Sequence, residues 1–144
     1  MRGVESLARV NAFGIDDLIN TMRKEGTIKE STKNDMLVAG ADVLIDEMRN
    51  QIKAMDIWDL GETWWSIKHS NVKNRQGEYY IEVWPAGKRR DDRHPSGERI
   101  ETVAFIAEYG TAKIPARPFM STAVKVAEER VAEAMRRVWE ERDR

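Results

Sequence analysis

Two segments of this chain repeat apolar residues at every third or fourth position, and this spacing limits the possible folds more than any other feature. Such residues share one face of an α-helix, and that face must be buried. The stripe of residues 30–55 consists of Leu37, Ala41, Leu44, Met48, Ile52 and Met55. The stripe that follows Pro118 consists of Met120, Ala123, Ala127, Val131, Ala134 and Val138. We therefore predict two long amphipathic helices.

Between these helices, alternating residues predict a β-hairpin. Residues 66–72 and 79–84 alternate well enough for strands, with a polar, glycine-containing loop at 73–78. In the second strand Tyr80 and Trp84 share the face opposite to Ile81, so we expect one face to pack on the helices and the other to meet a partner. A short helix is expected at 14–24, and either a short helix or a strand is expected at 100–109.

The expected fold class is α+β, with two long helices packed on a small antiparallel, hairpin-based sheet. At 144 residues the chain has the size of one domain, 1–144. Residues 85–99 mix five basic with three acidic side chains around Pro and Gly, which predicts an exposed, mobile charged loop. The longest apolar stretch, 36–41, is far below the roughly 20 residues of a membrane span, so we expect no membrane segment. We also expect no secretory signal near Arg2, because no apolar segment with a cleavage site follows.

Composition argues against several kinds of chemistry. The chain has no Cys and only 2 His, which disfavours disulfides and zinc sites, and it contains no glycine-rich phosphate loop. His69 and His94 lack a recognisable catalytic partner. We therefore expect no enzyme activity, no cofactor and no metal. The alternative enzyme is a small hydrolase that uses Asp56, Asp59 or Glu62.

A nucleic-acid-binding module is a further alternative. It would contact phosphates through Lys88, Arg89, Arg90, Arg93 and Arg99, and would stack Tyr79 or Tyr80 on bases. Against it, 24 basic and 25 acidic residues give a formal charge of -1, so no overall basic field attracts nucleic acid.

The most distinctive stretch is residues 103–120. Gly110 after Tyr109 permits a tight turn with positive φ, Pro115 and Pro118 stiffen the connection, and Phe119 anchors the last helix. Pro118 also suits a helix start, where no amide donor is needed. We hypothesise that Arg117 forms a bidentate ion pair with Glu108 or with a carboxylate of a neighbouring subunit.

This stretch resembles the phage tail-component family named after the gp-ten protein of phage HK-ninety-seven. The resemblance rests on the acidic-aromatic-Gly-Thr element Glu108-Tyr109-Gly110-Thr111 and on Ala116-Arg117-Pro118-Phe119 before the last helix. It extends upstream to Leu60-Gly61-Glu62-Thr63 and Ser66-Ile67, and covers roughly residues 37–137. The long charged segment 85–99 departs from the pattern, because a shorter connection is expected there.

The resemblance implies a structural virion protein of a long-tailed phage, made in the host cytoplasm and placed at the head-tail junction. It would join or complete head and tail as a homo-oligomeric ring of six copies, contacting adjacent neck and tail proteins. A tail terminator ring is the alternative. DNA would pass through the lumen without sequence-specific contact. Candidate motif and interface residues are Trp64, Trp65, Tyr80, Trp84, Arg89, Arg90, Glu108, Tyr109, Gly110, Thr111, Pro115, Arg117, Pro118 and Phe119.

Overall fold

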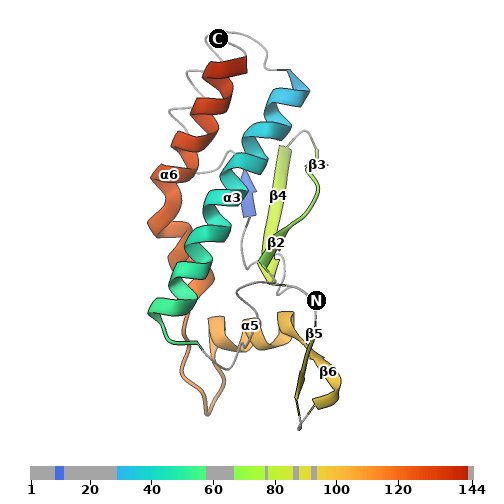
Figure 1. The fold of residues 1–144 in the computed structure, drawn as a ribbon, viewed down its shortest axis with the longest axis vertical. Helices are drawn as coiled ribbons and strands as arrows, with labels where there is room; N and C mark the ends of the chain where they lie inside the picture. Colours follow the sequence, from blue (N-terminus) through green and yellow to red (C-terminus); the bar gives the residue numbers. More distant parts are fainter. Residues whose placement is uncertain are drawn as a thin grey trace.

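A computed structural model describes residues 9–11, 29–57, 67–76, 78–85, 88–91 and 94–142, and for 9–11, 78, 88–91 and 94–103 no side chain is described. The elements in chain order (Figure 1) are β1 (Arg9–Asn11), α3 (Glu30–Ala54), β2 (Ile67–His69), β3 (Lys73–Arg75), β4 (Glu78–Pro85), β5 (Lys88–Asp91), β6 (His94–Arg99), α5 (Ile100–Tyr109) and α6 (Phe119–Arg142). The protein is thus α+β, as predicted. The helix predicted at 14–24 lies outside the described residues.

The two long helices, α3 and α6, lie side by side and run antiparallel (Figure 1). Arg142 near the end of α6 pairs with Asp35 near the start of α3, with 2.6 Å between Nη1 and Oδ2. Farther along, Arg130 pairs with the buried carboxylate of Glu47. Gly40 of α3 and Ala123 and Ala127 of α6 are small, buried residues. Both predicted helices are confirmed.

α3 also carries the sheet, in which β4 is the central strand. β1 pairs with one edge of β4, while β2 and β3 pair with the other edge, all antiparallel. His69 lies opposite Val83, and Lys73 lies opposite Tyr80. His69 and Lys73 are four residues apart, whereas the facing residues of β4 are only three apart. One extra residue therefore bulges between β2 and β3.

Ser70 holds this bulge in place. Its backbone N–H donates to the Glu82 carbonyl at 2.8 Å, and its hydroxyl oxygen accepts the Glu82 N–H at 3.0 Å. The predicted hairpin is confirmed, but its loop is shorter than expected, because 73–75 form strand β3 and the turn follows at Gln76, whose φ is 55°. Strand β3 escaped prediction because its three side chains are all exposed, so no apolar alternation marks it.

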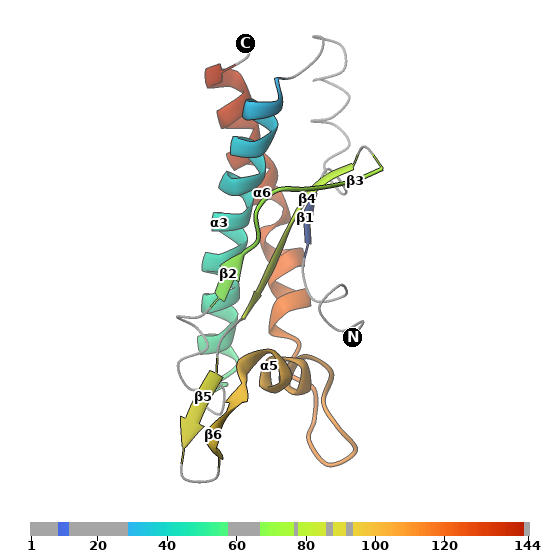
Figure 2. The ribbon, with the colours of Figure 1, turned by 90° about the vertical axis from the view of Figure 1, so that its right-hand side faces the viewer.

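The prediction of a mobile loop at 85–99 is wrong for most of its length. The backbone of β5 pairs antiparallel with that of β6 to form a two-stranded ribbon, which extends below α5 in Figure 2. The register places Arg89 opposite Glu98 and Asp91 opposite His94. The first of these pairs places an acidic residue opposite a basic one, which favours such a ladder. The sequence did not predict this ribbon, because its strands show no apolar alternation and contain Pro95 and Gly97.

The hydrophobic core lies where α3 meets both the sheet and α6. Ile81 and Val83 of β4 have no exposed surface, and Phe119 and Met120 begin α6 inside the same cluster. Within the part of the chain that the structure describes, none of the helices has a stretch long and apolar enough to cross a membrane.

A matched pair of valines tests this core. Val83→Ala removes two methyl groups from a site with no exposed surface, and should lower the free energy of unfolding by about 2 kcal/mol. Val126→Ala, at a helix position that is 53% exposed, should change it by less than about 0.5 kcal/mol. Urea unfolding followed by circular dichroism measures both. Equal effects would contradict the assigned burial of β4.

Candidate functional site

The connection between α5 and α6, residues 110–118, brings together most of the sequence motif. We call it the α5–α6 turn. It projects beyond the lower end of the long helices (Figure 2). Tyr109 ends α5 directly before it, and Phe119 begins α6 directly after it. Residues from Glu108 to Phe119, predicted as one motif, therefore form one continuous structure.

Gly110 starts the α5–α6 turn in a conformation that favours glycine. Its φ is +73°, and its N–H donates to the Ile106 carbonyl at 2.7 Å, which closes the last turn of α5. A Cβ at this position would lie 2.6 Å from the Ile114 carbonyl oxygen and 2.7 Å from the Ala116 nitrogen. Both atoms belong to the backbone and cannot swing aside. The turn therefore folds back onto Gly110 too closely for any side chain.

Thr111 closes the tip of the turn by local hydrogen bonds. Its hydroxyl oxygen accepts the N–H groups of Lys113, at 3.2 Å, and Ile114, at 3.0 Å. Its own N–H donates to the Ile114 carbonyl at 2.8 Å. Side-chain oxygens of Thr commonly satisfy turn amides in this way. Three hydrogen bonds thus hold four exposed residues in one shape.

Glu108 ties the last turn of α5 to the first turn of α6. Its side chain is buried, at 4% exposure, and its two carboxylate oxygens accept the N–H groups of Met120, at 3.2 Å, and Ser121, at 2.8 Å. These amides have no partner within their own helix, and the positive end of the helix dipole favours a carboxylate there. Glu108 therefore caps α6 from another helix.

Arg117 anchors the same junction through its backbone, because its N–H donates to the Ala107 carbonyl at 2.6 Å. Its carbonyl in turn accepts the Phe119 N–H at 2.8 Å. The predicted ion pair between the Arg117 and Glu108 side chains stays a prediction. Sequence reasoning missed the capping role of Glu108, because no local pattern links an acidic residue to a helix that begins eleven residues later.

The outward side of the α5–α6 turn is apolar. Tyr109 is 48% exposed and Ile114 is 43% exposed, and Pro115, Ala116 and Pro118, which follow Ile114, are exposed as well. The Tyr109 ring also packs against Phe105, with 4.7 Å between ring centroids. The charges within 110–118 are Lys113 and Arg117, and the segment contains no acidic residue. The turn thus offers a preformed apolar surface with a positive charge.

The structure does not bring the predicted aromatic interface residues together as it does the residues of the α5–α6 turn. Tyr80 is only 8% exposed, so the expectation that it adds to an exposed surface is wrong, and it cannot stack on nucleic acid bases in this conformation. Both faces of β4 are covered at this position, which the alternation of apolar and polar residues did not indicate. Trp84 is half-buried. Trp64 and Trp65 lie outside the described residues, and of Arg89 and Arg90 only the backbone, in β5, is described.

The described residues of the alternative catalytic hypotheses lie on separate elements. His69 lies in β2, where Nδ1 is 2.8 Å from the Ser70 carbonyl oxygen and Nε2 is 4.0 Å from Asp42, whereas His94 begins β6. Asp56 follows α3 with a φ of 57°, and Asp59 and Glu62 lie outside the described residues. Among the residues that the structure does describe, no three His, Asp or Glu side chains gather closely enough to hold a metal ion.

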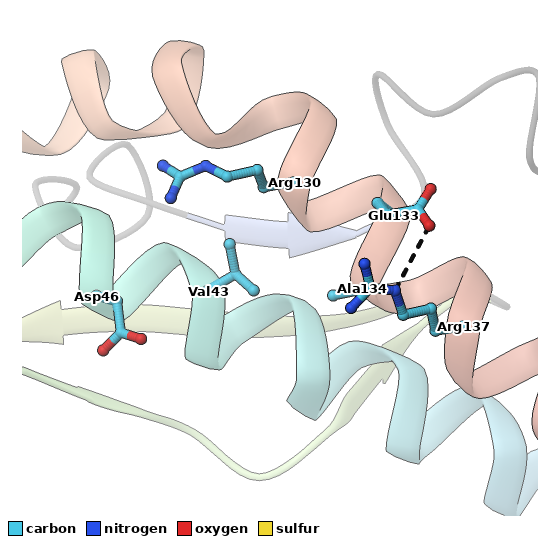
Figure 3. A pocket seen from close by; sticks show the side chains of 6 residues that line it. All are labelled: Val43, Asp46, Arg130, Glu133, Ala134 and Arg137. Carbon is cyan, nitrogen blue, oxygen red and sulfur yellow. Dashed lines mark ion pairs between the residues drawn. The ribbon is translucent and has the colours of Figure 1, made fainter.

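A second surface feature is a shallow groove of about 280 Å³ between α3 and α6 (Figure 3). We call it the α3–α6 groove. Val43 and Ala134 provide its apolar lining, and its charged lining consists of Asp46, Arg130, Glu133 and Arg137. Arg137 Nε lies 3.5 Å from Glu133 Oε1. Sequence reasoning did not find this groove, because it forms between helices that lie far apart in the chain.

No protein-family model, curated protein or solved structure matches the chain.

Graded substitutions at Glu108 test the capping arrangement. Glu108→Ala removes both acceptors and should lower the free energy of unfolding by about 1–2 kcal/mol. Glu108→Gln keeps one side-chain oxygen acceptor and should cost less. Glu128→Ala, an exposed acid of α6, is the matched control and should cost less than about 0.5 kcal/mol. Thermal and urea unfolding measure the order, and a neutral Glu108→Ala would refute the cap.

Two substitutions at Gly110 separate backbone strain from close approach. Gly110→Ala should destabilise the protein by about 2 kcal/mol or more, because it combines a positive φ with a backbone clash. Asn tolerates positive φ better than Ala, but its Cβ meets the same two backbone atoms. Gly110→Asn should therefore be no better tolerated than Gly110→Ala in urea unfolding. Recovery with Asn would show that φ alone selects glycine.

Proposed function

We propose that this chain is a structural virion protein of a long-tailed bacteriophage, which forms a ring in the neck and joins or completes head and tail. The observation that carries the proposal is the α5–α6 turn. The residues that resemble the phage tail-component family are the same residues that hold this turn in one shape and expose Tyr109 and Ile114. Binding to other protein subunits is the function that such a surface supports best.

The stiffness of the turn favours this role. An interface loop that is ordered before binding loses little conformational entropy when it binds. Here Glu108 fixes the far side of the turn, Thr111 fixes its tip, and Pro115 and Pro118 restrict the backbone. Tyr109 belongs to the residue types that contribute most to protein interfaces when they are enclosed, and Ile114 adds apolar area.

The near-neutral charge agrees with the proposed place in the neck. A ring through which DNA must move should not bind the phosphate backbone strongly, since a strongly basic lumen would slow the passage of DNA. With a formal charge of -1, the chain carries no overall excess of basic residues. The partners proposed are five further copies of the chain, the adjacent neck and tail proteins, and DNA without sequence-specific contact.

The mass of the protein in solution tests this proposal first. Light scattering after size exclusion over a concentration series, with and without purified phage tail tubes, should reveal a closed ring or a monomer that assembles only on tails. If rings of this protein stop the growth of a tail tube, the result would favour the tail-terminator alternative. A monomer that ignores tails and binds DNA with a steep salt dependence would overturn the proposal.

A further inference from the structure

The α3–α6 groove has features of a docking surface for a small apolar group. Val43 and Ala134 leave apolar surface between two helices, and charged side chains surround it (Figure 3). The two basic residues of the lining already have acidic neighbours. Arg130 pairs with Glu47, and Arg137 pairs with Glu133.

The α3 side of the groove is acidic. The Asp46 side chain is 74% exposed, and its nearest paired cation is Arg49 on the same helix, at 3.7 Å. Asp46 is the charged residue that α3 contributes to the groove lining. A ligand with an apolar tip and a nearby positive charge would complement this side.

The α5–α6 turn of another subunit has this chemistry. Ile114 is its exposed aliphatic side chain, Lys113 is the exposed cation next to it, and no acidic residue lies within 110–118. Its shape is set before binding, so insertion would require little reordering. A volume of about 280 Å³ suits one or two side chains rather than a longer segment.

Resting on the proposed ring, we propose that the α5–α6 turn of one subunit docks in the α3–α6 groove of a second copy of this chain, with Ile114 against Val43 and Ala134 and with Lys113 beside Asp46. The turn lies at one end of the molecule (Figure 2), and the groove lies between the long helices (Figure 3). The contact therefore joins two different surfaces, and head-to-tail contacts of this kind generate rings when the rotation closes.

The small size of this contact determines when assembly occurs. One side chain in a shallow groove gives weak binding between two free subunits. Subunits already held on a tail end would meet at a high effective concentration, so the same contact would then suffice. This arrangement favours a monomer in dilute solution and a ring on its target.

Introduced cysteines can detect the contact directly, because the chain contains no Cys of its own. Ile114→Cys and Val43→Cys are purified as separate proteins, mixed on tail tubes or at high concentration, and oxidised with diamide. The proposed contact should yield a disulfide-linked dimer only in the mixture. Ile114→Cys mixed with Lys125→Cys, an exposed position of α6 outside the groove lining, is the matched control and should yield much less.

Charge reversal provides a second measurement on the same contact. Lys113→Glu and Asp46→Lys should each raise the concentration for half-maximal assembly by about threefold or more, because each places like charges together. The double variant should recover much of the loss. Both positions are exposed, so the melting temperature of each variant should stay near that of the wild type.

The outcomes separate this inference from the proposed function. Rings that form on tails without the specific cross-link, or that ignore both charge reversals, would overturn the inference and leave the neck role standing. The specific cross-link in a protein that never associates with tails would support the self-contact and overturn the neck role. The absence of both would overturn both.

Discussion

The packing of α6 on α3 is the contact on which the rest of the structure depends. These helices lie more than sixty residues apart in the chain, and α3 also carries the sheet. α6 contributes the small, fully buried side chains of Ala123 and Ala127, and close packing of this kind accumulates dispersion contacts. The ion pair between Arg130 and the buried Glu47 helps to fix how α6 is aligned along α3, because an unpaired buried carboxylate would be costly in free energy. The position of α6 then fixes where the α5–α6 turn must end.

Three buried acids mark the places where separate elements are joined. Glu47 connects α3 to α6, Glu82 faces Lys73 across two strands at 3.3 Å, and Glu108 connects α5 to α6. Each is less than a tenth exposed. A buried carboxylate requires partners with defined geometry, whereas apolar contacts tolerate sliding. These residues therefore select one alignment of elements that hydrophobic packing alone would leave less well defined.

The long helices, the hairpin and the motif at 108–119 could be predicted because their signals are local. Apolar spacing marks α3 and α6, and glycine and proline mark the turn between α5 and α6. What failed depends on contacts between distant residues. Tyr80 was expected to be exposed from strand alternation, which cannot indicate that the second face of β4 is covered as well. The β5–β6 ribbon has no apolar pattern, and the α3–α6 groove exists only once two helices are packed.

The turn and the groove each form within a single subunit, and this suits the proposed assembly on a target. The turn takes its shape from hydrogen bonds within 107–121, so it is complete in a single subunit. The groove takes its shape from the α3–α6 contact, so it is also complete before any partner arrives. Two preformed surfaces of small area bind with little reordering but little total energy. On the proposed function, such subunits should remain separate until a template brings several together, and the template would then decide where the proposed ring forms.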